Sequence, residues 1–88
     1  MRIPWRSKTN EPSVRLLLTV LDADSCVVSF EPEGGFVQLD RGDAFSVEII
    51  GPGDGIVEVS YAPDGLSIGA WSGAATVAHD RQGNRLDI

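Results

Sequence analysis

Apolar and polar residues alternate along two stretches near the middle of the chain, 44–50 (AFSVEII) and 56–61 (IVEVSY). An alternation with period two is typical of strands that bury one face and expose the other. The intervening residues 51–55 (GPGDG) are the glycine, proline and aspartate that chain reversals favour. The pattern therefore predicts an antiparallel hairpin from Ala44 to Tyr61, and we expect the other strands to be added to it.

The rest of the chain repeats the same succession of short apolar stretches and turns. Further strands are expected at residues 14–21, 26–30, 36–39, 66–71, 74–79 and 86–88. Glycine, proline and aspartate are frequent in the segments between them, as in turns. Seven or eight short strands of this kind predict an all-β fold, either a small antiparallel β-sandwich, which we favour, or a partly open barrel. Within that class we expect an immunoglobulin-like sandwich that lacks the usual disulfide.

Residues 14–21 (VRLLLTVL) are the one stretch where a helix and a strand compete. The apolar residues of this stretch fit one face of a helix as well as one face of a strand. A strand is favoured because the stretch is short, ends in an acidic turn and is followed by another β-rich stretch. The nearly continuous apolar character predicts a central strand, or one that is covered on both faces.

The length of 88 residues is that of a single domain. Residues 1–12 (MRIPWRSKTNEP) contain two prolines and mostly polar side chains, so we expect an extended basic N-terminal arm, with the β-sandwich in residues 13–88. Trp5 is unusual there, because a tryptophan on a free arm would leave a large apolar surface in water. We expect Trp5 to dock on the body or on a neighbouring subunit.

Charge is distributed unevenly along the chain. The net charge is −6, but residues 1–15 carry +3 and the remainder therefore carries −9. A body of that sign repels phosphate backbones and anionic lipids, so we expect neither a nucleic acid nor a membrane as partner. The chain has no apolar stretch long enough for a membrane span and no secretory signal pattern. A cytoplasmic location is expected.

Residues that commonly carry catalysis or bind metals are few. Cys26 is the only cysteine, which excludes an intrachain disulfide, and its apolar neighbours predict a small buried side chain. His79 is the only histidine, no nucleophile motif accompanies it, and we expect a partly exposed residue at a strand end. Asp22 and Asp24 have the spacing of the first two ligands of a calcium loop, but the later ligands are missing. We therefore expect no enzyme, no cofactor and no metal site.

Two glycine-containing motifs also have ordinary structural explanations. The residues Arg41, Gly42 and Asp43 spell a tripeptide that resembles the integrin-recognition motif, but they are also good turn residues. The GPGDG stretch resembles a phosphate-binding loop only in its glycines. A strand follows it instead of a helix, and no lysine is near. Both motifs are interpreted as turns.

The remaining candidates for function are aromatic. Trp5, Tyr61 and Trp71 suit contacts with a protein partner, and Tyr61 and Trp71 suit core positions at strand ends equally well. We predict a non-enzymatic protein–protein interaction module, which binds its partner through Trp5 with Arg2 and Arg6, and through Tyr61 and Trp71. A homodimer through the N-terminal arm is one form of this. The alternative is a small-ligand or carbohydrate-binding module that uses the surface aromatics.

Overall fold

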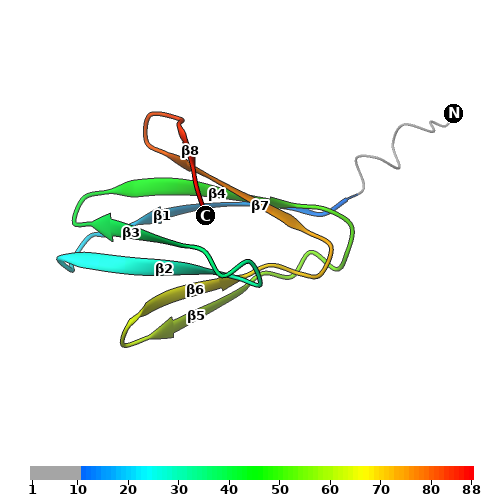
Figure 1. Cartoon of the computed structure of the whole chain (residues 1–88), viewed down its shortest axis with the longest axis horizontal. Helices are drawn as coiled ribbons and strands as arrows, with labels where there is room; N and C mark the ends of the chain where they lie inside the picture. The colour runs from blue at the N-terminus through cyan, green and yellow to red at the C-terminus, as the bar shows by residue number, and fades with distance from the viewer. Residues whose placement is uncertain (1–10) are drawn as a thin grey trace, which may run out of the picture.

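A computed structural model describes residues 11–88 as eight β-strands in two layers (Figure 1). The strands are β1 (Ser13–Thr19), β2 (Ser25–Glu31), β3 (Phe36–Asp40), β4 (Ala44–Ile50), β5 (Glu58–Ala62), β6 (Gly65–Gly69), β7 (Ala75–Asp80) and β8 (Arg85–Leu86). The all-β fold, the number of strands and the sandwich are confirmed. Residues 1–10, which make up most of the predicted arm, lie outside the described part of the chain.

Each layer is a four-stranded sheet. The first sheet has the order β1-β4-β7-β8 and is antiparallel throughout. The second has the order β3-β2-β6-β5, and its β2–β6 pair is parallel, so the sandwich is not entirely antiparallel. In immunoglobulin domains the first two strands are neighbours in one sheet, whereas here β1 lies beside β4 and β2 belongs to the other layer. The immunoglobulin-like subclass stays a prediction.

The predicted hairpin from Ala44 to Tyr61 is wrong. Both arms are strands, but β4 lies between β1 and β7 in the first sheet, and β5 pairs with β6 in the second. Residues 51–57 instead carry the chain from one sheet to the other. Local alternation shows that two stretches are strands, but a connection of this length reaches across the ~10 Å between two sheets as readily as it closes a hairpin.

Residues 14–21 do form a strand over most of their length, as predicted, but β1 is not central. It pairs only with β4 and is an edge of the first sheet. Val14, Leu16 and Leu18 are half-buried and pack against the core, while Leu17 on the other face is 74% exposed. Continuous apolar character therefore did not indicate cover on both faces.

The core consists of alternate residues that the two sheets direct at one another. Its most buried large side chains are Phe30, Phe45, Ile49, Ile68, Val28 and Val47. Phe30 of the second sheet and Phe45 of the first meet edge to face, with ring centroids 6.1 Å apart and planes inclined at 81°. Cys26, which was predicted to be buried, packs against this core but is only half-buried.

Two connections between the sheets meet at one end of the sandwich. Residues 51–57 lead from β4 to β5, and residues 70–74 lead from β6 to β7. The side chain of Trp71 is buried there, and its Nε1–H is shared between the carbonyl oxygens of Gly51 at 3.2 Å and Pro52 at 3.1 Å. This contact fixes the path by which the chain enters β5.

Candidate binding surface along strand β5

The predicted binding residues fall in three different places. Arg2, Trp5 and Arg6 lie outside the described residues. Trp71 is only 6% exposed and belongs to the core, whereas Tyr61 is 85% exposed on β5. Tyr61 pairs with Leu66 at the start of β6, while Trp71 follows the end of that strand, so the two rings are not brought together. Of Tyr61 and Trp71, only Tyr61 is therefore exposed enough to contribute to a carbohydrate platform.

Strand β5 is the most exposed strand of the described chain. All five of its residues are exposed, and it pairs with β6 on one side only. Figure 1 shows it at the outer margin of the second sheet. The other edge of β5 therefore presents backbone N–H and C=O groups without a neighbouring strand, which is an arrangement that can accept a further strand.

The side chains of β5 show that the two sheets do not cover each other completely. Val59 pairs with Ile68, which is buried in the core, and Tyr61 pairs with Leu66, which is half-buried. Directly paired residues point to the same face of a sheet, so Val59 and Tyr61 project on the core-facing side. They are nevertheless 52% and 85% exposed, because the first sheet does not extend over them. We call Val59, Tyr61 and the free edge of β5 the β5 margin.

The surroundings of the β5 margin are acidic. The chain has no lysine or arginine between Arg41 and Arg81, so β5 and both connections next to it carry no fixed positive charge. Asp54 precedes the strand, Glu58 begins it and Asp64 lies in the turn after it. The face of the second sheet opposite to Val59 and Tyr61 has an open depression of about 510 Å³. Glu31, Asp54 and Glu58 are among the residues that line it. This side of the molecule is thus suited to a cationic ligand.

His79 is half-buried, and its neighbour Asp80 is engaged in a turn. His79 pairs with Ser46 while Asp80 pairs with Phe45, so the two adjacent side chains point to opposite faces of β7. Asp80 Oδ1 accepts hydrogen bonds from the backbone N–H groups of Asn84 at 2.8 Å and Gln82 at 3.0 Å. The Asn84 bond is the main cause that lowers the pKa of Asp80 below its ordinary value of 3.8. The carboxylate closes a turn and does not orient the histidine.

The acidic turn and the RGD tripeptide contact each other. Arg41 Nη2 donates to Asp24 Oδ1 at 3.0 Å, and Asp43 Oδ2 accepts from the backbone N–H of Asp40 at 2.9 Å. The tripeptide is thus a turn, as predicted. Within residues 11–88, no group of three histidine, cysteine, aspartate or glutamate side chains is arranged to hold a metal ion.

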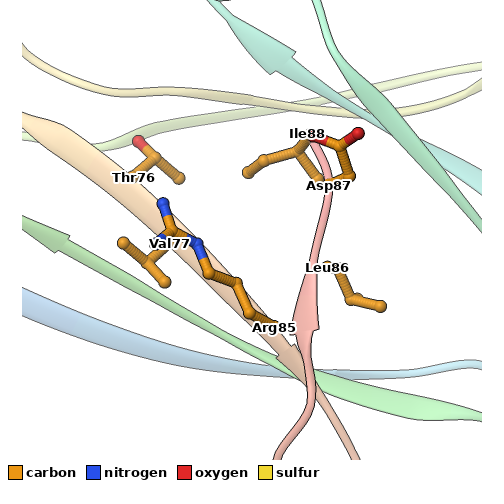
Figure 2. Close-up of a pocket in the computed structure, with 6 residues that line it drawn as sticks. All are labelled: Thr76, Val77, Arg85, Leu86, Asp87 and Ile88. Carbon is orange, nitrogen blue, oxygen red and sulfur yellow. The ribbon is translucent and has the colours of Figure 1, made fainter.

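A second depression lies where β8 separates from β7 (Figure 2). It measures about 320 Å³ and is lined by Thr76 and Val77 of β7 and by Arg85, Leu86, Asp87 and Ile88. Only residues 85 and 86 pair with β7, so the gap opens where the ladder stops. The lining contains one guanidinium and one carboxylate but neither a thiol nor an imidazole. We therefore regard this depression as a weaker candidate for binding a partner than the β5 margin.

The β5 margin was only partly visible in the sequence. The sequence singles out Tyr61 together with Trp71, while Val59 is only one of the apolar positions in the alternating stretch 56–61. One available signal was the absence of lysine and arginine from residues 42–80, which indicates an acidic surface whatever the fold. No local pattern indicates that β5 is an edge, because this depends on the strand order.

The fold defines a small two-layer β-sandwich protein with one exposed, acidic edge strand. No protein family, no curated protein and no solved structure shows a significant match to this chain. In residues 11–88, no helix has the length and apolar character needed to cross a bilayer.

Proposed function

We propose that the protein is a non-enzymatic interaction module that binds an extended segment of a protein partner along the β5 margin. The observation that carries the proposal is the exposure of all five residues of β5, although Val59 and Tyr61 project on the core-facing side. In this recognition mode a peptide adds a strand to a sheet edge. Backbone hydrogen bonds supply affinity, and alternate side chains supply specificity.

The surroundings define the chemistry of the partner. A strand beside β5 would direct alternate side chains toward Val59 and Tyr61, and these side chains would be apolar to remain out of water. The other side chains would lie near Asp54, Glu58 and Asp64, which favour lysine or arginine. The preferred partner segment therefore alternates apolar and basic residues.

Peptide titration tests the proposal. Short peptides that alternate isoleucine or tryptophan with lysine are added to the isotope-labelled full chain, and amide chemical shifts are recorded. We expect the largest shifts in Glu58–Ala62, and at least tenfold weaker binding of a peptide in which glutamate replaces lysine. Shifts confined to another strand, or no preference for the basic peptide, would contradict the proposal.

A pair of matched substitutions locates the binding surface. Val59→Lys places a positive charge and a flexible side chain at the β5 margin, whereas Leu17→Lys makes the same change at an exposed position of the other sheet. We expect Val59→Lys to abolish binding of the basic peptide and Leu17→Lys to leave it unchanged. Equal effects of the two substitutions would show that overall charge, and not β5, determines binding.

We also propose that the protein is cytoplasmic and binds neither nucleic acid nor membranes. The net charge of −9 in residues 11–88 supports a protein partner over nucleic acid or an anionic membrane. We place the protein in the cytoplasm, because its single cysteine excludes the intrachain disulfides that stabilise many small secreted domains. Fractionation of the native host, followed by immunodetection of the protein, tests this placement.

A further inference from the structure

We infer that the segment bound at the β5 margin is residues 2–8 of a second copy of this chain, so that the protein forms a homodimer by exchanging N-terminal segments. The inference rests on the proposed function, since it names the partner of the same surface. It follows from the chemistry of the segment, from its length and from the way the described chain begins.

The segment has the chemistry that the β5 margin requires. Residues 2–8 read RIPWRSK, with Arg2, Arg6 and Lys8 at even positions, Ile3 and Trp5 at odd positions and no acidic residue. In an extended strand these two sets project on opposite faces. Ile3 and Trp5 would meet Val59 and Tyr61, while the three cations would lie near the acidic groups. Pro4 is compatible with this position, because an added edge strand has one side without ladder partners.

The segment is also long enough. At ~3.3 Å for each residue of an extended strand, seven residues span roughly 23 Å and the five residues of β5 about 17 Å. Residues 2–8 can therefore pair with the whole length of β5. The second sheet would then have five strands.

The entry of the chain into β1 favours a second copy over the same copy. The N–H of Gly51 donates to the carbonyl of Pro12 at 3.3 Å, which extends the β1–β4 ladder one step beyond the pair Ser13–Ile50. The described chain therefore begins in line with β1, at the end of the sandwich where residues 51–57 cross between the sheets. To pair with its own β5, the segment would have to reverse direction within residues 8–11, whereas pairing with another copy needs no reversal.

Electrostatics gives the segment a necessary role in the dimer. Residues 11–88 contain all 13 acidic residues but only four of the seven basic ones, so two such bodies repel each other. Each exchanged segment brings three positive charges to the acidic side of the other copy. Reciprocal exchange between two copies is closed by two-fold symmetry, and the second pairing becomes intramolecular once the first has formed.

Disulfide cross-linking between separately prepared copies tests the inference. Both copies carry Cys26→Ala in the full chain. One also carries Lys8→Cys and the other Ser60→Cys, two positions that project on the same face in the proposed pairing, and they are mixed with oxidised glutathione. We expect a disulfide-linked dimer that contains one copy of each. The control replaces Ser60→Cys with Ser25→Cys, an exposed serine on β2, and is expected to yield at least tenfold less dimer.

A chain that carries both Lys8→Cys and Ser60→Cys distinguishes the two ways of pairing. An intrachain link in this monomer, together with no link in the mixture, would show that residues 2–8 bind their own β5 and would overturn the inference. No link in either experiment would overturn it as well. If the full chain does not dimerise but still binds the basic peptides at β5, the inference falls and the proposed function stands.

Light scattering and sedimentation of the full chain provide an independent measurement. We expect a dimer whose dissociation constant rises at least tenfold with Val59→Lys or with Trp5→Ser, and remains unchanged with Leu17→Lys. The melting temperature of each variant shows that the sandwich is intact. A dimer that tolerates both Val59→Lys and Trp5→Ser, or a monomer at every concentration, would overturn the inference.

Discussion

The indole N–H of Trp71 donates a hydrogen bond to the carbonyl oxygen of Gly51 at 3.2 Å. This bond joins the connection from β6 to β7 with the connection from β4 to β5. A second acceptor, the Pro52 carbonyl at 3.1 Å, lies in the same connection. These two of the four crossings between the sheets are therefore joined to each other, and the start of β5 is held relative to both layers.

Replacing Trp71 with phenylalanine tests the contribution of this bond. Trp71→Phe keeps an aromatic ring in the core but leaves the Gly51 and Pro52 carbonyls without their donor. We expect a loss of about 1–3 kcal/mol in the free energy of unfolding, measured by urea denaturation. The control is Tyr61→Phe on exposed β5, which should change the stability by less than about 0.5 kcal/mol. Equal effects would show that the hydrogen bond contributes nothing measurable.

Position 53 requires glycine for two reasons, its backbone conformation and the lack of room for a side chain. Its φ of 143° is one that other residues rarely adopt, and a Cβ there would collide with Cδ1 of Trp71. Gly53→Ala should therefore combine backbone strain with displacement of a buried ring, a loss of about 2–5 kcal/mol. At Gly42, with φ 86°, no heavy atom lies within 4 Å of the added carbon, so Gly42→Ala should cost only about 1 kcal/mol. Similar melting temperatures for the two variants would contradict the tight packing at Gly53.

The edge-to-face pair of Phe30 and Phe45 should be visible in a double-mutant cycle. We expect Phe30→Leu and Phe45→Leu to couple by about 0.5–1.5 kcal/mol in the free energy of unfolding, because each removes the partner of the other ring. Phe36 is an exposed residue on the outer face of the second sheet. The cycle of Phe36→Leu with Phe45→Leu should be additive to within about 0.5 kcal/mol. Additivity in the first cycle as well would mean that the rings pack independently.

The Asp80 turn should make a contribution to stability that depends on pH. Since the pKa of Asp80 is lowered in the folded chain, its stabilisation is complete above the ordinary pKa of 3.8 and is lost as the pH falls through the lower, folded value. Asp80→Asn should therefore lower the melting temperature at neutral pH, and the difference from the unaltered chain should vanish in strong acid.

Thermal denaturation followed by circular dichroism across that pH range checks this expectation. The matched control is Asp22→Asn, in an exposed turn, which should leave the melting temperature at neutral pH unchanged. A difference for Asp80→Asn that persists unchanged into acid would show that the charge of Asp80 is not the cause.

Much of the local structure follows from short patterns. The strands around Cys26, Phe36 and Val77 were predicted close to their observed bounds, because alternation with period two needs only a few residues. The proline, aspartate and glycine of residues 63–65 are typical of a turn, and Ala62 and Gly65 do close the β5–β6 hairpin.

Which strands pair with each other could not be predicted from short sequence patterns. Val47 of β4 pairs with Leu16 on one side and with Ala78 on the other, over about 31 residues in each direction, and no neighbouring residue encodes either choice. The connection after β4 could equally have closed a hairpin. The core contact of Phe45 with Phe30 and the bond from Trp71 to Gly51 stabilise the crossing instead.

The sequence by itself determined the strands, most turns, the small number of catalytic side chains and the acidic character of residues 42–80. Only the tertiary structure decided that Trp71 is buried, that β5 is an edge and that Val59 and Tyr61 are exposed on the core-facing side. The physical reason is that exposure depends on what covers a strand. For β5, this is set by the strand order and by the extent of the opposite sheet, which arise from contacts between residues far apart in the chain.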